Sequence, residues 1–229
     1  MRHGHPSGSA RTLTTTEARA FYDRFGAKQD AQAFYEDRAL DPLIAHADFQ
    51  HAHSIFEFGC GTGRLAARLL ATTLPDDCHY LGVDISTTMV ALAGERLRPW
   101  AHQAEVVCSE GAIPPQCAAG AYDRFVSTYV LDLMGEAAIT AALAAAHRLL
   151  CREGLLCLVS LTHGHTFVTK FVSATWETVH RLNSKLVGGC RPIELHDFLG
   201  QDRWLVQHHE VVSAWGITSE VLVASRLGS

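Results

Sequence analysis

The sequence lacks the patterns that mark several classes of protein. None of its seven cysteines form a Cys-x-x-Cys pair, and no set of cysteines and the 14 histidines has the spacing of a zinc site. An odd number of cysteines, most of them in apolar segments, is typical of a chain kept under reducing conditions. We therefore expect a cytoplasmic protein without a bound metal.

Long apolar runs and clustered basic residues are missing as well. No run approaches the length of a membrane span, and the N-terminus has no charged-then-apolar signal pattern. Lys and Arg total 19 against 24 Asp and Glu, which gives a formal charge of −5 without a basic patch. Because binding to nucleic acid usually needs such a patch, the composition counts against DNA or long RNA as a partner.

The sequence does contain a short apolar run that meets three alternating glycines. Ile55–Phe58 leads into Gly59, Gly61 and Gly63, after which a helical pattern begins. Glycine can turn sharply at positive φ and bring bare backbone against a ligand. A strand, this turn and a helix N-terminus together predict a nucleotide-sized cradle lined with N–H groups.

The glycine spacing differs from the dinucleotide fingerprint, because Arg64 occupies the place of its third glycine. Glu-x-Gly-x-Gly-x-Gly instead resembles the first motif of class I S-adenosylmethionine-dependent methyltransferases. The resemblance implies a Rossmann-like α/β fold: a seven-stranded, mostly parallel sheet, helices on both faces and an antiparallel C-terminal hairpin strand. It implies S-adenosylmethionine as cofactor, bound around the motif by Glu57, Gly59, Cys60, Gly61 and Gly63.

Residues 1–46 are expected to precede the methyltransferase domain proper, which we place at 47–229. Residues 1–11 are expected to be a flexible leader or a remnant of an added tag. Thr14 and Glu17 have the spacing of a capping box, so one or two amphipathic helices should run from there to about His46. This segment is similar to the N-terminal cap of many small-molecule methyltransferases, and Tyr22 is the residue that we expect to contact the methyl donor.

A second apolar strand, His79–Asp84, ends in an acid 21 positions after Gly63. A carboxylate at this place binds the ribose hydroxyls, whereas the alternative role is to cap the next helix. Ser86 is the better cap, which leaves Asp84 for the ribose. The resemblance further implies that Ile85 and Met89 line the adenine.

The strand Ala104–Cys108 is followed by Ser109-Glu110-Gly111-Ala112, which resembles the third signature of the family. Glu110 would be the acid near the adenine amine. Ser109 replaces the usual glycine and Glu110 is one carbon longer than the usual Asp, so the backbone N–H of Gly111 or Ala112 is the alternative contact.

The segment that begins at Tyr122 is similar to the fourth strand of these enzymes, and its carboxyl end should lie beside the transferable methyl group. Thr128 is therefore assigned to the donor and Tyr129 to the acceptor or to catalysis. Asp132 is a candidate for the acceptor, with the start of the next helix as an equally good role. An alanine-rich helix, Glu136–Leu150, and a fifth, buried strand, Gly154–Leu161, follow.

Residues 162–200 interrupt the alternation of strands and helices and are expected to form an insertion on the acceptor side. His163 and His165 are candidate general bases, although both also suit a loop without chemistry. Cys190 and Arg191 are candidate acceptor-binding residues, with an exposed turn as the alternative. Two strands, Trp204–Val212 and Ser219–Ser225, should close the sheet around a turn at Gly216.

Other absences narrow the acceptor. The sequence has no Asn/Asp-Pro-Pro-aromatic tetrapeptide after the fourth strand, no Pro-Cys pair and no adjacent cysteines. These absences disfavour amino-methylation of nucleic acid, cytosine C5 methylation and an arsenical acceptor. A small-molecule acceptor with an O, N, S or C nucleophile remains. Two alternatives stay open: a non-catalytic partner subunit that keeps the donor pocket, and a nucleotide-dependent oxidoreductase.

Overall fold

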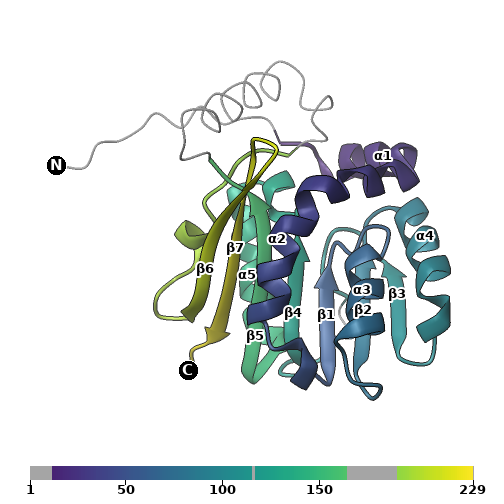
Figure 1. Ribbon diagram of the computed structural model, residues 1–229. Helices are drawn as coiled ribbons and strands as arrows, with labels where there is room; N and C mark the ends of the chain where they lie inside the picture. Colours follow the sequence, from purple (N-terminus) through teal and green to yellow (C-terminus); the bar gives the residue numbers. More distant parts are fainter. Residues whose placement is uncertain (1–11, 115–116, 164–189, 229) are drawn as a thin grey trace.

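The computed structural model describes residues 12–114, 117–163 and 190–228. Seven strands form one sheet in the order β3-β2-β1-β4-β5-β7-β6 (Figure 1). β1 to β5 are parallel, whereas β7 is antiparallel to both β5 and β6. The predicted Rossmann-like fold with an antiparallel C-terminal hairpin is thus confirmed.

The strands have the bounds β1 Ser54–Phe58, β2 His79–Asp84, β3 Ala104–Cys108, β4 Tyr122–Thr128, β5 Leu150–Leu161, β6 Trp204–Ala214 and β7 Ile217–Arg226. The α-helices are α1 Thr15–Phe25, α2 Ala33–His46, α3 Arg64–Thr72, α4 Thr87–Leu97 and α5 Glu136–Leu149. Short 3-10 helices are η1 Gly26–Gln32, η2 Phe49–His51, η3 Arg98–Trp100, η4 Leu131–Leu133 and η6 Leu195–Phe198.

Two apolar clusters lie on the two faces of the sheet. On one face, α2 and α3 pack their leucines against β1, β5 and β7; on the other face, α5 and η6 pack against alternate residues of the same strands. Since side chains alternate between faces along a strand, the apolar run Leu155–Leu161 of β5 contributes to both clusters. The sheet is therefore covered on both sides, as predicted.

The N-terminal segment begins with the predicted capping box. Thr14 Oγ1 accepts from the backbone N–H of Glu17 at 3.2 Å, and the Glu17 carboxylate accepts from the Thr14 N–H at 3.0 Å. This reciprocal arrangement satisfies two orphan N–H groups of α1. The segment then continues through η1 into α2, so the predicted one or two helices are two α-helices joined by a 3-10 helix.

Two other expectations need adjustment. β5 starts at Leu150, four residues before the predicted strand, because Tyr122 of β4 pairs with Leu150 before a shift in register. Asp132 does not begin an α-helix: it lies in η4, and α5 has Gly135 as its N-cap. Within the described residues, no helix is both long and apolar enough to span a bilayer.

Candidate functional site

The turn after β1 requires glycine for steric reasons. Gly59, Gly61 and Gly63 have φ values of +79°, +53° and +73°, which side chains of L-residues rarely adopt. A Cβ atom on Gly59 would lie 2.3 Å from a Val130 methyl group at the end of β4. The backbone of the turn therefore packs closely against Val130, two residues after β4.

A largely apolar pocket opens at the carboxyl ends of β1, β2 and β4. Phe58, Val83, Ile85 and Val130 supply its apolar wall, and Asp84 and Ser109 are among its polar residues. The cap closes the pocket from above with Tyr22 of α1 and Gln29 of η1. Such a space suits a flat ring system that carries hydroxyl groups at one edge.

A second, polar pocket adjoins the first one. Gln29, Gly59, Thr128 and Tyr129 line both pockets, so the two form one continuous site. The side chains that line only the second pocket are mostly charged or polar: Asp30, Glu36, Glu57, Cys60, Thr62 and Arg64, with the apolar Leu40 and Leu65. An elongated ligand that fits both pockets has an aromatic end and a zwitterionic or highly polar end.

Glu57 is a fully enclosed acid beneath the glycine turn. Tyr80 of β2 donates its hydroxyl hydrogen to Glu57 Oε2 at 2.6 Å, and the Glu57 residue is 2% exposed. Burial raises the pKa of Glu57 to about 8, and the negative charge of Asp84 acts in the same direction. A cation in the polar pocket would favour the ionised form of this acid.

Asp84 orders the turn as well as facing the pocket. Its Oδ2 accepts from the Gly61 N–H at 3.0 Å, and its Oδ1 accepts from the Ser86 N–H at 2.8 Å. Ser86 caps α4 through the Met89 N–H, as predicted, but Asp84 is not left free of backbone partners. Burial raises the pKa of Asp84, although these two N–H groups oppose the shift.

Polar contacts hold α1 over the ends of β2 and β3. Arg19 donates from Nε to the Ile85 carbonyl at 2.8 Å, and Asp23 accepts from the Ser86 hydroxyl at 2.6 Å. This bond, together with the Thr88 N–H, holds the pKa of Asp23 below its usual range. α1 is thus fixed where its Tyr22 side chain reaches the pocket.

The following part of the cap is fixed to the glycine turn. Asp30 of η1 accepts from the Thr62 hydroxyl at 2.6 Å and pairs with Arg96 of α4, which also donates to the Thr62 carbonyl at 2.9 Å. Arg64, the residue that breaks the dinucleotide fingerprint, pairs with Glu36 of α2 at 2.6 Å and also with Asp37. Side chains of the cap and of the sheet domain therefore build the polar pocket jointly.

A buried group of titratable side chains lies on the far side of Tyr22. Asp132 is 0% exposed, and neither of its carboxylate oxygens has a hydrogen-bond partner among the described residues. Burial raises the pKa of Asp132 to about 7. Burial also raises the pKa values of Tyr22 and Cys190, and the negative charge of Asp132 raises both further. Asp132, Tyr22 and Cys190 therefore lie near one another.

Arg191 and Tyr129 border this group. Arg191 donates its backbone N–H to the Asp132 carbonyl at 3.1 Å and a guanidinium N–H to the Met134 carbonyl at 3.0 Å. Tyr129 adopts a positive φ of 56°, and its hydroxyl lies 2.8 Å from the Ser219 hydroxyl of β7. The phenol of Tyr129 is therefore engaged with the sheet.

The structure brings together part of the residue set predicted from sequence. Tyr22, Gly59, Gly61, Asp84, Ile85, Thr128 and Tyr129 line the apolar pocket, and Glu57 and Cys60 line the polar one. The other predicted positions are not among the residues that line these pockets. Of these, Met89 is buried, Glu110, Ala112 and His163 are exposed, Gly63 is the N-cap of α3, Gly111 is half-buried, and His165 lies outside the described residues.

Sequence reasoning missed the contribution of η1 to the site. Gln29 lies over the glycine turn, where a Cβ on Gly61 would be 3.0 Å from its amide nitrogen. Its Oε1 is buried without a hydrogen-bond partner among the described residues, so a ligand N–H or O–H is the group it lacks. No local motif marks Gln29, because its position depends on the tertiary contact of η1 with the turn.

The family comparison finds a similarity in the central part of the chain. Residues 55–154 match the family model described as a methyltransferase domain. Over these residues the chain is similar to methyltransferase domains. The matched residues contain the glycine turn, Asp84 and the end of β4, and the cap that precedes them supplies the other residues that line the two pockets.

Solved structures share the fold at low identity. The cyclase SpnF is 16% identical, with 95% of this chain and 98% of that chain covered and a TM-score of 0.70. Magnesium protoporphyrin IX methyltransferase from Synechocystis PCC 6803, solved with bound SAH, is 17% identical, with coverage of 93% and 99% and a TM-score of 0.68. The O-methyltransferase NcsB1 from neocarzinostatin biosynthesis, in complex with S-adenosylmethionine and 2-hydroxy-5-methyl naphthoic acid, is 16% identical, with coverage of 93% and 58% and a TM-score of 0.64.

The search of curated proteins finds no match. The same fold also occurs in a protein described as a cyclase, so the fold by itself does not specify the reaction. The reaction has to be argued from the side chains of the site.

Proposed function

We propose that this protein transfers a methyl group from S-adenosylmethionine to a small-molecule acceptor and releases S-adenosylhomocysteine. The proposal rests on one observation. The apolar pocket, with the Asp84 carboxylate at its edge, is continuous across the glycine turn with a pocket lined by charged groups. The cofactor has the same two parts in the same order: an adenosine with an apolar ring and ribose hydroxyls, and a charged amino-acid end. The match of residues 55–154 to methyltransferase domains supports the same cofactor.

The apolar pocket would hold the adenosine. Asp84 is placed to accept hydrogen bonds from the ribose hydroxyls while it holds the Gly61 N–H, and Ile85 and Val83 form apolar walls for the adenine. Gln29, whose buried Oε1 has no partner among the described residues, supplies an acceptor from the cap. The glycine turn lets the backbone approach the ligand where a Cβ would meet Gln29 or Val130.

The polar pocket would hold the amino-acid end. Arg64 is positioned to attract its carboxylate, and Glu57 its ammonium group. Because Arg64 is already paired with Glu36 and Asp37, its guanidinium is held in place before the ligand binds. Tyr22 and Thr128 would then lie between the donor and the acceptor.

S-adenosylmethionine supplies a methyl group on a positively charged sulfur, and an acceptor nucleophile displaces the sulfur in line. An acceptor hydroxyl must lose a proton as the new bond forms. Asp132 is the group that we assign to take it, since its pKa of about 7 keeps it basic enough to act near neutral pH. Asp132 is buried near Tyr22 and Cys190, which supports an acceptor on this side of the site. Arg191, which the sequence also suggested, would bind the acceptor from the same side.

Isothermal titration with S-adenosylmethionine and, separately, with S-adenosylhomocysteine tests the donor site. We expect micromolar binding of both. Replacing Asp84 with Asn should weaken binding by about 1–3 kcal/mol, or roughly 5- to 150-fold, because a charge-assisted acceptor is lost. The matched control is Asp76→Asn, since Asp76 is exposed in the loop before β2; its affinity should not change.

Equal affinity of folded Asp84→Asn and Asp76→Asn variants would reject the assigned role of Asp84. No binding of either ligand by the folded wild-type protein would reject S-adenosylmethionine as the donor. Binding without transfer of labelled methyl to a panel of hydroxy-aromatic and other small acceptors would favour a non-catalytic donor-binding subunit.

A further inference from the structure

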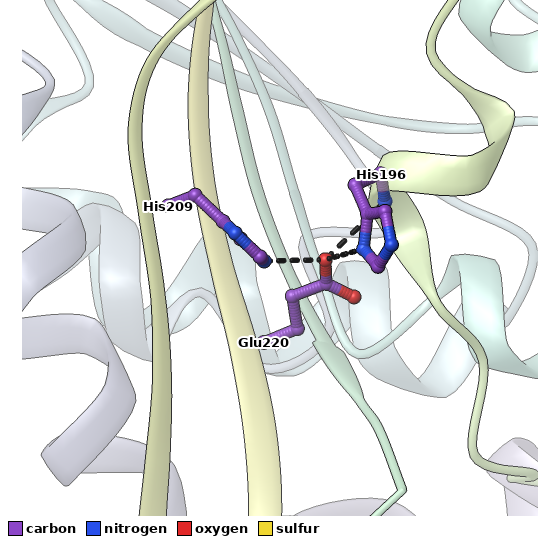
Figure 2. Close-up of side chains that lie close together, drawn as sticks. All are labelled: His196, His209 and Glu220. Atoms are coloured by element: carbon purple, nitrogen blue, oxygen red, sulfur yellow. Dashed lines mark hydrogen bonds and ion pairs between the residues drawn. The ribbon is translucent and has the colours of Figure 1, made fainter.

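A second group of polar side chains lies at the opposite edge of the sheet from the ends of β2 and β3. His196 of η6, His209 of β6 and Glu220 of β7 point toward one another (Figure 2). Their nearest nitrogen and carboxylate oxygen atoms all lie within 4.8 Å of one another. This group is separate from both pockets of the methyltransferase site, none of whose lining residues it shares.

The register of the hairpin brings His209 and Glu220 to the same face. His209 pairs with Leu222 across the β6–β7 ladder, and Glu220 is two residues from Leu222 on β7. Residues two apart on a strand point to the same side, as do directly paired residues on neighbouring strands. This is the face covered by α5 and η6, because Leu222 packs with their apolar residues.

Glu220 holds its carboxylate inside the protein in a fixed orientation. The residue is 0% exposed, and its Oε2 accepts from the Leu195 N–H at 2.5 Å. Its Oε1 lies 2.8 Å from His196 Nδ1 and 2.8 Å from His209 Nε2. The two imidazole side chains are 46% and 39% exposed, so the site faces solvent on the histidine side.

We propose that His196, His209 and Glu220 bind a divalent transition-metal ion, with Zn²⁺ as the ion of choice. Two imidazole nitrogens and one carboxylate oxygen are a donor set that Zn²⁺ accepts readily, and the solvent-facing side leaves a position for water. The three atoms need only small movements to surround an ion at about 2.0–2.2 Å from each. The ion would take the place of the hydrogens that the two rings direct at Glu220: in a neutral ring this hydrogen shifts to the other ring nitrogen, and from a protonated ring it is released to solvent.

Asp197 supplies the outer partner that a metal-binding histidine usually has. Its Oδ1 lies 3.3 Å from His196 Nε2, the ring nitrogen that faces away from Glu220. When His196 Nδ1 binds the ion, the proton of the neutral ring moves to Nε2 and is donated to Asp197, so the ring loses no proton. The Leu195 N–H similarly holds the non-coordinating oxygen of Glu220.

Metal binding would connect the edge of the sheet to the acceptor side of the site. The segment that precedes His196 donates from Arg191 N–H to the Asp132 carbonyl and from Ile193 N–H to the Leu161 carbonyl. An ion bound by η6, β6 and β7 would therefore fix the position of this segment. The role is structural, because the ion is not in contact with either pocket.

Titration of the metal-free, full-length protein with Zn²⁺ tests the proposal, with a chromophoric chelator as competitor. We expect one ion per chain with a micromolar or lower Kd and a rise in Tm. His196→Gln and His209→Gln should each weaken binding at least tenfold, because Gln keeps an N–H donor for Glu220 but is a poor metal ligand. His102→Gln is the control, since His102 is exposed in the turn before β3.

Co²⁺ distinguishes this site from the seven cysteines. A site of nitrogen and oxygen ligands should give visible d–d bands without the intense near-ultraviolet charge-transfer bands of a cobalt thiolate. Absence of binding by folded wild-type protein, binding that neither Gln variant weakens, or a thiolate spectrum would each overturn the proposal. The first result would leave the three side chains as a hydrogen-bonded group without an ion.

Discussion

The protonation state of Asp132 is determined mainly by its burial in the protein. Its carboxylate is enclosed, lacks hydrogen-bond partners among the described residues and has its pKa raised to about 7 by burial. Burial disfavours the charged carboxylate in the folded protein, whereas the unfolded chain ionises freely. The free energy of unfolding therefore falls at any pH at which the unfolded chain is ionised. A group that costs stability and adjoins a ligand site is a candidate for function.

Replacing Asp132 with Asn should therefore have opposite effects on stability and on activity. At pH 3 and below the acid is largely protonated in both states, so the two proteins should be about equally stable. Between about pH 4 and 7 Asp132 ionises only in the unfolded wild-type chain, so the free energy of unfolding of the wild-type protein falls as the pH rises. At pH 8 the variant should therefore be more stable than the wild-type protein by at least about 1 kcal/mol, or about 2–4 °C in Tm. Thermal unfolding at pH 3 and pH 8 measures this difference.

The same variant should lose the rise in methyl transfer through pH 7 that a base of this pKa gives to the wild-type protein. Asp76→Asn is the control for both measurements. An unchanged pH–rate profile in Asp132→Asn would show that another group takes the proton, with His163 the next candidate from sequence.

At the scale of elements, the cap formed by α1, η1 and α2 completes the site. Arg19 and Asp23 fix α1 over β2 and β3. Asp30 fixes η1 to the glycine turn, both directly through the Thr62 hydroxyl and through Arg96. Ion pairs that are partly exposed contribute little to global stability. Their effect should be local, on how often η1 lies over the donor pocket.

Replacing Arg96 with Gln should loosen η1 and weaken donor binding severalfold, with little change in the global free energy of unfolding. Hydrogen exchange of residues 26–32 and titration with the donor measure the two effects. Arg98→Gln is a matched control: Arg98 pairs at 3.5 Å with Glu95, and both side chains are more than three-quarters exposed. If Arg96→Gln and Arg98→Gln behave alike, the contact between Asp30 and Arg96 does not hold the cap.

The elements themselves could be predicted from local patterns. The β2 and β3 bounds, the capping box at Thr14 and the Ser86 cap all follow from residue type and spacing, and the structure has them. The parts that could not be predicted depend on contacts between distant segments. Gln29 and the site of His196, His209 and Glu220 are of this kind, since no spacing in the chain records them.

At the scale of the whole molecule, the cap and the sheet share one core. Leu43 of α2 is 0% exposed and belongs to the same apolar cluster as Ile55 of β1 and Val221 of β7. The boundary that we placed after residue 46 therefore runs between segments that are packed together. Removing residues up to 46 would uncover this face of the sheet.

Replacing Leu43 with Ala should thus destabilise the entire protein by about 2–5 kcal/mol, because it leaves a cavity in a shared core. Urea unfolding followed by circular dichroism measures the loss. Phe34→Ala in the same helix is the control, since Phe34 is 55% exposed and should cost much less. A loss confined to α2, with the sheet unfolding as before, would instead describe the cap as an independent unit.

The hairpin at the edge of the sheet also restricts how the chain can change in length. His209 and Trp204 are an odd number of residues apart, yet both lie on the α5 face, because the ladder shifts register at Gln207. Deleting one residue there would turn either Trp204 or His209 to the opposite face. Insertions and deletions in this part of β6 should therefore be tolerated in pairs and selected against singly.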